Sequence, residues 1–151
     1  MKVKIFLEDG AVLPKKAHET DHAYDVYASR MQMLSNGVIE YGTGVHIGLP
    51  ERDKNGLRPC MFMASRSGIC QTGLILSNGK GICDNGYRGE YMAKFYPILP
   101  LGLCKPYDVG DRIAQMYLSN GEDIEWVIVN SLEELGETDR GNTGYGDSGL
   151  K

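Results

Sequence analysis

The sequence predicts an all-β domain, built as a sandwich or barrel of short strands. Glycine is abundant, with 20 residues among 151, whereas proline is limited to 6. Because glycine adopts the backbone angles that tight turns need, this balance favours a chain that reverses direction often. Apolar residues alternate over short runs, and no long stretch keeps the 3.6-residue period of a helix. Many short strands with frequent turns are typical of a sandwich or barrel.

The expected strands are short runs rich in apolar, β-branched or aromatic residues. They cover residues 2–7, 45–49, 60–64, 91–98, 112–118 and 124–129. Asn-Gly dipeptides, which mark turns, begin at positions 36, 55, 78, 85 and 120. The evidence for helix is one turn or two at residues 67–71 and a capping box formed by Ser131 and Glu134. We therefore expect one short helix at most.

Length and charge narrow the class of protein. A chain of 151 residues suits one domain and can bury a core without disulfides. The net charge of −4 argues against a nucleic-acid partner, since such proteins are generally basic. An acidic protein can still bind phosphate through local arginines, backbone N–H groups or a divalent ion.

We expect a cytoplasmic protein with no membrane partner. No apolar run approaches the ~18 residues that a membrane span needs, and the first residues lack the apolar core of a signal peptide. The cysteines form no CxxC pair, so we expect reduced, mostly buried thiols. The three histidines are scattered and do not predict a metal site.

The end of the chain differs from the rest. Residues 136–151 include five glycines, and only Tyr145 and Leu150 are large and apolar. Such a segment cannot bury enough surface to fold alone. It is either a disordered tail or an arm that becomes ordered over a ligand. The sequence therefore divides into a folded domain at 1–135 and an arm at 136–151.

Two segments carry residues suited to chemistry. In residues 77–92 two β-type stretches flank Asn85-Gly86, which predicts a hairpin. Asp84 lies just before this turn and Tyr87 just after it. A carboxylate at such a position can cap its own backbone or act on a ligand. In residues 64–70, Arg66 and Ser67 precede a flexible glycine, and together they form a plausible phosphate cradle.

These segments belong to a longer series. Its members are Ala-Tyr-Asp-Val at 23–26, Ser-Arg-Ser-Gly at 65–68, Gly-Ile-Cys-Asp at 81–84 with Tyr-Arg-Gly at 87–89, Gly-Asp-Arg-Ile-Ala-Gln at 110–115, and Arg-Gly at 140–141 with Gly-Tyr-Gly-Asp-Ser-Gly at 144–149. In this order they resemble the five motifs of the trimeric dUTP pyrophosphatase (dUTPase) family. The resemblance covers nearly the whole chain, and its third and fifth motifs are the most specific.

The resemblance implies a fold, an assembly and a reaction. The fold is a β-sandwich of jelly-roll type that forms a homotrimer. Each active site takes parts from all three subunits, and the glycine-rich arm closes over a neighbouring active site. The reaction is the hydrolysis of dUTP to dUMP and pyrophosphate with Mg²⁺. Residues 1–135 are then the catalytic domain.

The third motif is expected to bind the nucleoside and to activate water. By resemblance, Asp84 prepares the water that attacks the α-phosphorus, and Tyr87 packs against the deoxyribose. The residues expected around uracil are Asn78, Gly81, Ile82, Cys83 and Met92. A narrow pocket excludes the 5-methyl group of thymine, and unpaired buried polar groups reject cytosine.

The other motifs are expected to hold the triphosphate. The residues implied for the phosphates are Arg66, Ser67, Gly68 and Gln115, with Arg140, Gly146 and Ser148 closing from the arm. Tyr145 would stack over the uracil. Asp25 is either structural or in contact with the hydration shell of Mg²⁺, which keeps several waters when its protein ligands are few.

Two other functions remain open. A dCTP deaminase shares the fold but needs a glutamate as proton shuttle, and Lys94 occupies the corresponding position. A nucleotide-binding trimer without turnover would keep the fold alone. The sequence also departs from the usual dUTPase pattern at Cys83, Gly86 and Asp147.

Overall fold

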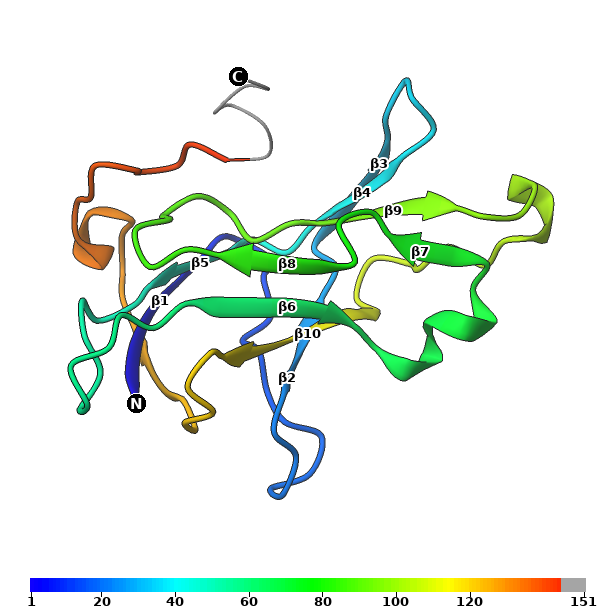
Figure 1. The fold of residues 1–151 in the computed structure, drawn as a ribbon. Helices are drawn as coiled ribbons and strands as arrows, with labels where there is room; N and C mark the ends of the chain where they lie inside the picture. The colour runs from blue at the N-terminus through cyan, green and yellow to red at the C-terminus, as the bar shows by residue number, and fades with distance from the viewer. Residues whose placement is uncertain (145–151) are drawn as a thin grey trace.

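The structure is a computed structural model that describes residues 1–144 and consists of short strands in three sheets (Figure 1). The first sheet has the order β11-β1-β5, from Glu125–Ile128, Lys2–Leu7 and Val45–Gly48. The second has the order β2-β10-β6-β8, from Tyr24–Tyr27, Arg112–Leu118, Met61–Ser65 and Lys80–Cys83. The third has the order β3-β4-β9-β7, from Arg30–Met33, Ile39–Gly42, Ala93–Pro97 and Leu74–Leu76.

The prediction of an all-β fold is confirmed. The described residues contain no α-helix, and three short 3-10 turns replace the single helix allowed by the sequence. These turns are η1 (Ser67–Gln71), η2 (Leu101–Leu103) and η3 (Glu133–Leu135). None of them is long and apolar enough to cross a membrane.

Two of the strands that the sequence did not predict lack an alternation of burial. β2 is buried at three consecutive positions, and all four residues of β3 are exposed. By contrast, β1 and β10 occupy the predicted residues, and β1 alternates exposed and buried side chains over its first half. Alternation reveals a strand only when one of its faces meets solvent and the other meets the core.

The predicted hairpin around Asn85-Gly86 is wrong. β8 pairs with β6 in the second sheet, whereas the next strand, β9, pairs with β4 and β7 in the third. Residues 84–92 therefore cross from one sheet to another. The crossing is anchored where the Tyr91 N–H donates to the Val45 carbonyl at 2.9 Å. A local pattern identifies a strand but not the distant strand with which it pairs.

The core lies where the three sheets meet. Tyr41, Tyr91 and Phe95 are its largest fully buried side chains. The rings of Tyr41 and Phe95 meet edge to face, with centroids 5.7 Å apart and an angle of 78°. This geometry is favoured by the quadrupoles of aromatic rings, so the contact contributes beyond its buried area.

The C-terminal segment, from residue 136 on, follows a residue that is packed into the core. Leu135 in η3 is buried, and a Cβ placed on Gly48 would lie 2.8 Å from its carbonyl oxygen. Only glycine at position 48 allows this approach. From there the chain returns toward the loop after β8 and is described as far as Gly144 (Figure 1). Tyr145, Gly146 and Ser148 lie outside the described residues.

Truncating the core aromatic should destabilise the fold strongly. Phe95 is 0% exposed, so we expect Phe95→Ala to lower the free energy of unfolding by about 3–5 kcal/mol, from lost burial and the cavity left behind. Equilibrium unfolding in urea measures this change. The neighbouring Tyr96, which is 43% exposed, provides the control, because Tyr96→Ala should cost far less. Equal losses for the two variants would contradict this account of the core.

Candidate functional site

A small cavity lies beside β8 and the crossing loop that follows it. Its volume is about 170 Å³. We call it the nucleoside cavity, after the ligand that the sequence analysis predicts for its residues, and it is lined by Met63, Asn78, Gly81, Ile82, Cys83, Asp84, Tyr87, Met92, Arg140 and Gly144. The structure thus brings together every predicted third-motif residue and the arginine of the fifth motif. Met63 and Gly144 were not predicted.

Glycines shape the entrance to the nucleoside cavity. Gly79 has φ +65°, a left-handed conformation that permits the tight turn before β8, where its N–H donates to the Leu76 carbonyl at 2.9 Å. Gly81 lies opposite Met63 in the β6–β8 ladder, and a Cβ there would come within 3.3 Å of the Asn78 side-chain nitrogen. The absence of that Cβ leaves room for the amide at the cavity wall.

Tyr87 forms a fixed wall of the nucleoside cavity. Its ring is 7% exposed, and its hydroxyl donates to the Glu90 carbonyl at 3.0 Å. The ring of Tyr91 packs against it with centroids 5.8 Å apart. The phenol therefore presents a face, rather than a free hydroxyl, to any occupant.

Asp84 lies at the rim of the nucleoside cavity and forms an ion pair with Arg140. Its side chain is 51% exposed, so the carboxylate is accessible to water. The guanidinium of Arg140 also lies over the Tyr87 ring, 5.9 Å from its centroid. Carboxylate, cation and aromatic face thus converge on one small space.

Hydrogen bonds attach the C-terminal segment to the crossing loop. The Thr138 hydroxyl donates to the Gly86 carbonyl and accepts from the Gly141 N–H at 3.0 Å. The Arg88 N–H donates to the Gly141 carbonyl at 2.7 Å. These bonds bracket Arg140, which explains its position beside Asp84.

The Cys83 thiol is a weak nucleophile. Burial raises its pKa to about 12, and the neighbouring Asp84 charge acts in the same direction. The thiol therefore stays protonated near neutral pH, and only the thiolate is a strong nucleophile. Cys83 serves as an apolar part of the wall.

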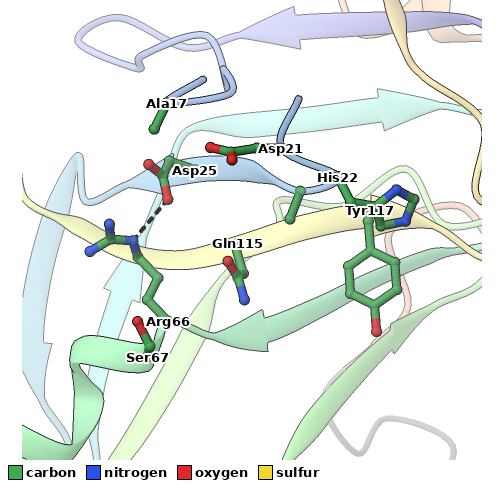
Figure 2. Close-up of a pocket in the computed structure, with 9 residues that line it drawn as sticks. Ala17, Asp21, His22, Asp25, Arg66, Ser67, Gln115 and Tyr117 are labelled. Atoms are coloured by element: carbon green, nitrogen blue, oxygen red, sulfur yellow. Dashed lines mark hydrogen bonds and ion pairs between the residues drawn. The ribbon is translucent and has the colours of Figure 1, made fainter. Parts of the chain in front are cut away.

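A second cavity of about 460 Å³ lies on the second sheet (Figure 2). We call it the polar cavity, and its lining residues are Ala17, Asp21, His22, Ala23, Asp25, Arg66, Ser67, Gln115 and Tyr117. Of the predicted phosphate residues, Arg66, Ser67 and Gln115 are present. Gly68 follows Ser67 in η1 but does not line the cavity.

Asp25 links two arginines at the base of the polar cavity. The Arg66 Nε donates to Oδ1 at 2.8 Å (Figure 2), and the Arg112 Nη1 donates to Oδ2 at 3.0 Å. Asp25 is 8% exposed. Asp21 also lines the polar cavity, whereas Arg112 does not, so the guanidinium groups offer local hydrogen-bond donors to a phosphate without a net positive charge. Beside them, the Gln115 amide donates to the Ser65 carbonyl at 3.2 Å.

The two cavities share none of the described residues. Cys83 pairs with Met61 at the start of β6, and Ser67 follows Met61 by six residues. A strand rise of about 3.3 Å per residue puts roughly 15 Å or more between Cys83 and Ser67. In one chain, Asp84 and Ser67 are therefore too far apart to contact the same phosphate.

Comparison with known proteins identifies the family. A model of the dUTPase family matches residues 9–149. The chain belongs to the dUTPase family. Its relatives include the deoxyuridine 5'-triphosphate nucleotidohydrolases of Corynebacterium jeikeium, 36% identical over 91% of this chain and 86% of the relative, and of Mycobacterium leprae, 35% identical over 95% and 91%.

Solved dUTPase structures show the same fold. The dUTPase from phage phi11 of S. aureus superposes with a TM-score of 0.60 at 20% identity, over 77% of this chain and 88% of that chain. The predictions of the dUTPase family, of a jelly-roll-like β fold and of a hydrolase are therefore confirmed.

Some lining residues were missed by the sequence analysis. Tyr117 lies two positions after Gln115 on β10, so the alternation of a strand places both on one face. This alternation could have identified Tyr117 from the sequence. Arg112 was quoted in the fourth motif without a role, and its contact with Asp25 required the pairing of β10 with β2. Nothing local in the sequence predicts that contact.

Proposed function

We propose that the chain hydrolyses dUTP to dUMP and pyrophosphate, using water that Asp84 activates for attack on the α-phosphorus. The observation that carries the proposal is the nucleoside cavity, in which Asn78, Tyr87 and Asp84 meet. The relatives at 35–36% identity are deoxyuridine 5'-triphosphate nucleotidohydrolases. Their reaction needs a base site, a sugar site and a carboxylate in this order along the substrate.

The small volume of the nucleoside cavity favours a pyrimidine. We propose that the Asn78 amide and the backbone of β8 pair with the uracil edge. A base with the wrong donors would leave buried polar groups unpaired, which costs more than a poor apolar fit. The Tyr87 face would pack against the deoxyribose and leave no space for a 2′-hydroxyl.

Asp84 is proposed as the general base. Its accessible carboxylate can accept a proton from water, and an ionised carboxylate suits this role at neutral pH. The water attacks in line with the departing pyrophosphate, so most of the rate comes from positioning and charge stabilisation. Arg140 pairs with Asp84, and a bound phosphate would offer the guanidinium a second anionic partner.

The polar cavity is proposed to hold the triphosphate of a nucleotide whose base lies in another subunit. The distance between Ser67 and Cys83 within one chain supports this arrangement. A homotrimer would bring the polar cavity of one copy to the nucleoside cavity of the next. Arg66, Ser67 and Gln115 would then contact the phosphates, with Gly68 offering its backbone N–H.

Magnesium is proposed to enter with the triphosphate. The described residues contain no cluster of three acidic, histidine or cysteine side chains that could hold a metal ion. Both oxygens of Asp25 already accept guanidinium hydrogen bonds, so a contact through water fits better than direct coordination. When bound, Mg²⁺ would neutralise charge on the phosphate oxygens. A solved phage phi11 dUTPase structure describes a structural Mg(II) ion in that protein.

The structure supports hydrolysis over deamination. Lys94, which occupies the place of the deaminase glutamate, forms an ion pair with Glu40 at 2.8 Å and does not line the nucleoside cavity. A nucleotide-binding protein without turnover is the other alternative. The accessible Asp84 favours catalysis, because simple binding of a triphosphate gains nothing from a carboxylate at the cavity rim.

A nucleotide panel separates the three functions. The full chain is incubated with the common ribo- and deoxyribonucleoside triphosphates and Mg²⁺, and products are resolved by chromatography. We expect dUMP and pyrophosphate from dUTP and little product from dTTP, dCTP or UTP. Ammonia from dCTP would indicate a deaminase, and dUTP binding without product would indicate a regulatory role.

Removing the proposed base should abolish most turnover. We expect Asp84→Asn to lower kcat by about 10²–10⁴-fold, because general-base catalysis is lost, while KM changes only a few-fold. Steady-state kinetics with dUTP measure both constants. Asp9→Asn, at an exposed carboxylate on another turn, is the matched control and should leave both unchanged. A kcat within threefold of the wild type would exclude Asp84 as the base.

Deleting Gly136–Lys151 tests the arm. The deletion leaves Leu135 and the rest of the core in place, so the fold and oligomer should persist. It removes Arg140, and we expect kcat to fall by about 10²–10³-fold through lost charge stabilisation. Kinetics with dUTP give the loss, and circular dichroism with size-exclusion chromatography checks the fold. Normal turnover would show that the segment is only a tail.

A further inference from the structure

Tyr87 separates the nucleoside cavity from another cavity behind it. This rear cavity has a volume of about 370 Å³. Its lining residues are His46, Tyr87, Arg88, Gly89, Glu90, Met92, Leu132, Asn142 and Gly144. Tyr87 lines both cavities, whereas Gly89 lines only the rear one. Gly89 therefore touches the back of the tyrosine wall.

The contact between Gly89 and Tyr87 leaves no room for a side chain. A Cβ on Gly89 would lie 2.4 Å from the Tyr87 Oη, 2.6 Å from Cζ and 2.8 Å from Cε2. Gly89 is not among the glycines with positive φ, so its backbone conformation is open to other residues. The close approach of the phenol is thus what requires glycine here.

The ring cannot easily retreat from such a clash. Its hydroxyl is tied to the Glu90 carbonyl, and Tyr91 packs against it. A Cβ on Gly144 would lie 3.0 Å from Cε2 of Tyr87, so a second glycine also packs closely against this ring. A methyl group added at Gly89 would therefore push the Tyr87 ring, which also borders the nucleoside cavity, away from position 89.

We propose that Gly89 is a specificity-determining position that sets the depth of the sugar-binding space through Tyr87. This inference rests on the proposed function, in which the ring packs against the deoxyribose. Because position 89 has no side chain, the Tyr87 ring leaves enough space for C2′ of a deoxynucleotide but not for a 2′-hydroxyl. Gly89 acts through Tyr87 and is a positioning residue.

The test is Gly89→Ala, with dUTP and UTP as substrates. We expect kcat/KM for dUTP to fall at least about tenfold, because a misplacement near 1 Å can cost that much or more. The kcat/KM for UTP should stay at its low background level. The ratio of kcat/KM for dUTP to that for UTP therefore falls. Inhibition constants for dUMP and UMP should converge likewise. A merely destabilised protein would contain less active enzyme, so its inhibition constants for dUMP and UMP would stay at their wild-type values.

Two further variants make the test specific. Gly102→Ala is the matched control, because position 102 lacks a positive φ and a Cβ there meets nothing within 4 Å. Tyr87→Phe removes the nearest atom and the anchor to Glu90, so the ring can turn away. Adding Gly89→Ala to Tyr87→Phe should cost much less than adding it to the wild type, a coupling that a double-mutant cycle measures.

Each outcome decides a different claim. A wild-type protein that does not hydrolyse dUTP refutes the proposed function, not the packing. A wild type that hydrolyses dUTP, with an unchanged preference in Gly89→Ala, overturns the inference. If Gly89→Ala fails to fold, Tyr87→Phe should restore folding in the double variant. A double variant that also fails to fold would show that freeing the ring from Glu90 does not relieve the clash, so that position 89 serves folding and not specificity, which again overturns the inference.

Discussion

The site depends on one anion, the carboxylate of Glu90, whose side chain is only 10% exposed. It accepts hydrogen bonds from the Thr43 and Gly44 N–H groups, each at 2.8 Å, and forms an ion pair with Arg30. These contacts fix the loop that crosses from the second sheet to the third. Arg30 reaches Glu90 across Gly42, where a Cβ would overlap the guanidinium. Asp84 and Tyr87 lie on this loop, so their positions follow from the same anchor.

Much of the fold and of the nucleoside cavity could be predicted, because their signals are local. β1 and β10 expose one face, and their alternation is visible in the sequence. Asp84 and Tyr87 were placed correctly at a turn. The predicted hairpin failed because pairing between distant strands has no local signature. The contact between Asp25 and Arg112, 87 residues apart, was inaccessible for the same reason.

Charge and apolar surface are divided between the two cavities. Arg66 lines the polar cavity together with Asp21 and Asp25, and Arg112 pairs with Asp25 from outside the lining. The nucleoside cavity is lined by the aromatic ring of Tyr87 and by the protonated thiol of Cys83. Under the proposed function, a chain with a net charge of −4 would bind the triphosphate through a few local guanidinium, hydroxyl and amide groups and not through a basic surface.

The cysteines give the two cavities different exposure to oxidants. The protonated, buried Cys83 is a poor target for peroxide. Cys70 is exposed, and its sulfur contacts the Ser67 carbonyl at 3.2 Å. Oxidation of the protein would therefore begin beside the polar cavity. If the two cavities bind the triphosphate and the nucleoside as proposed, a stored preparation would lose affinity for the triphosphate before it loses affinity for the nucleoside.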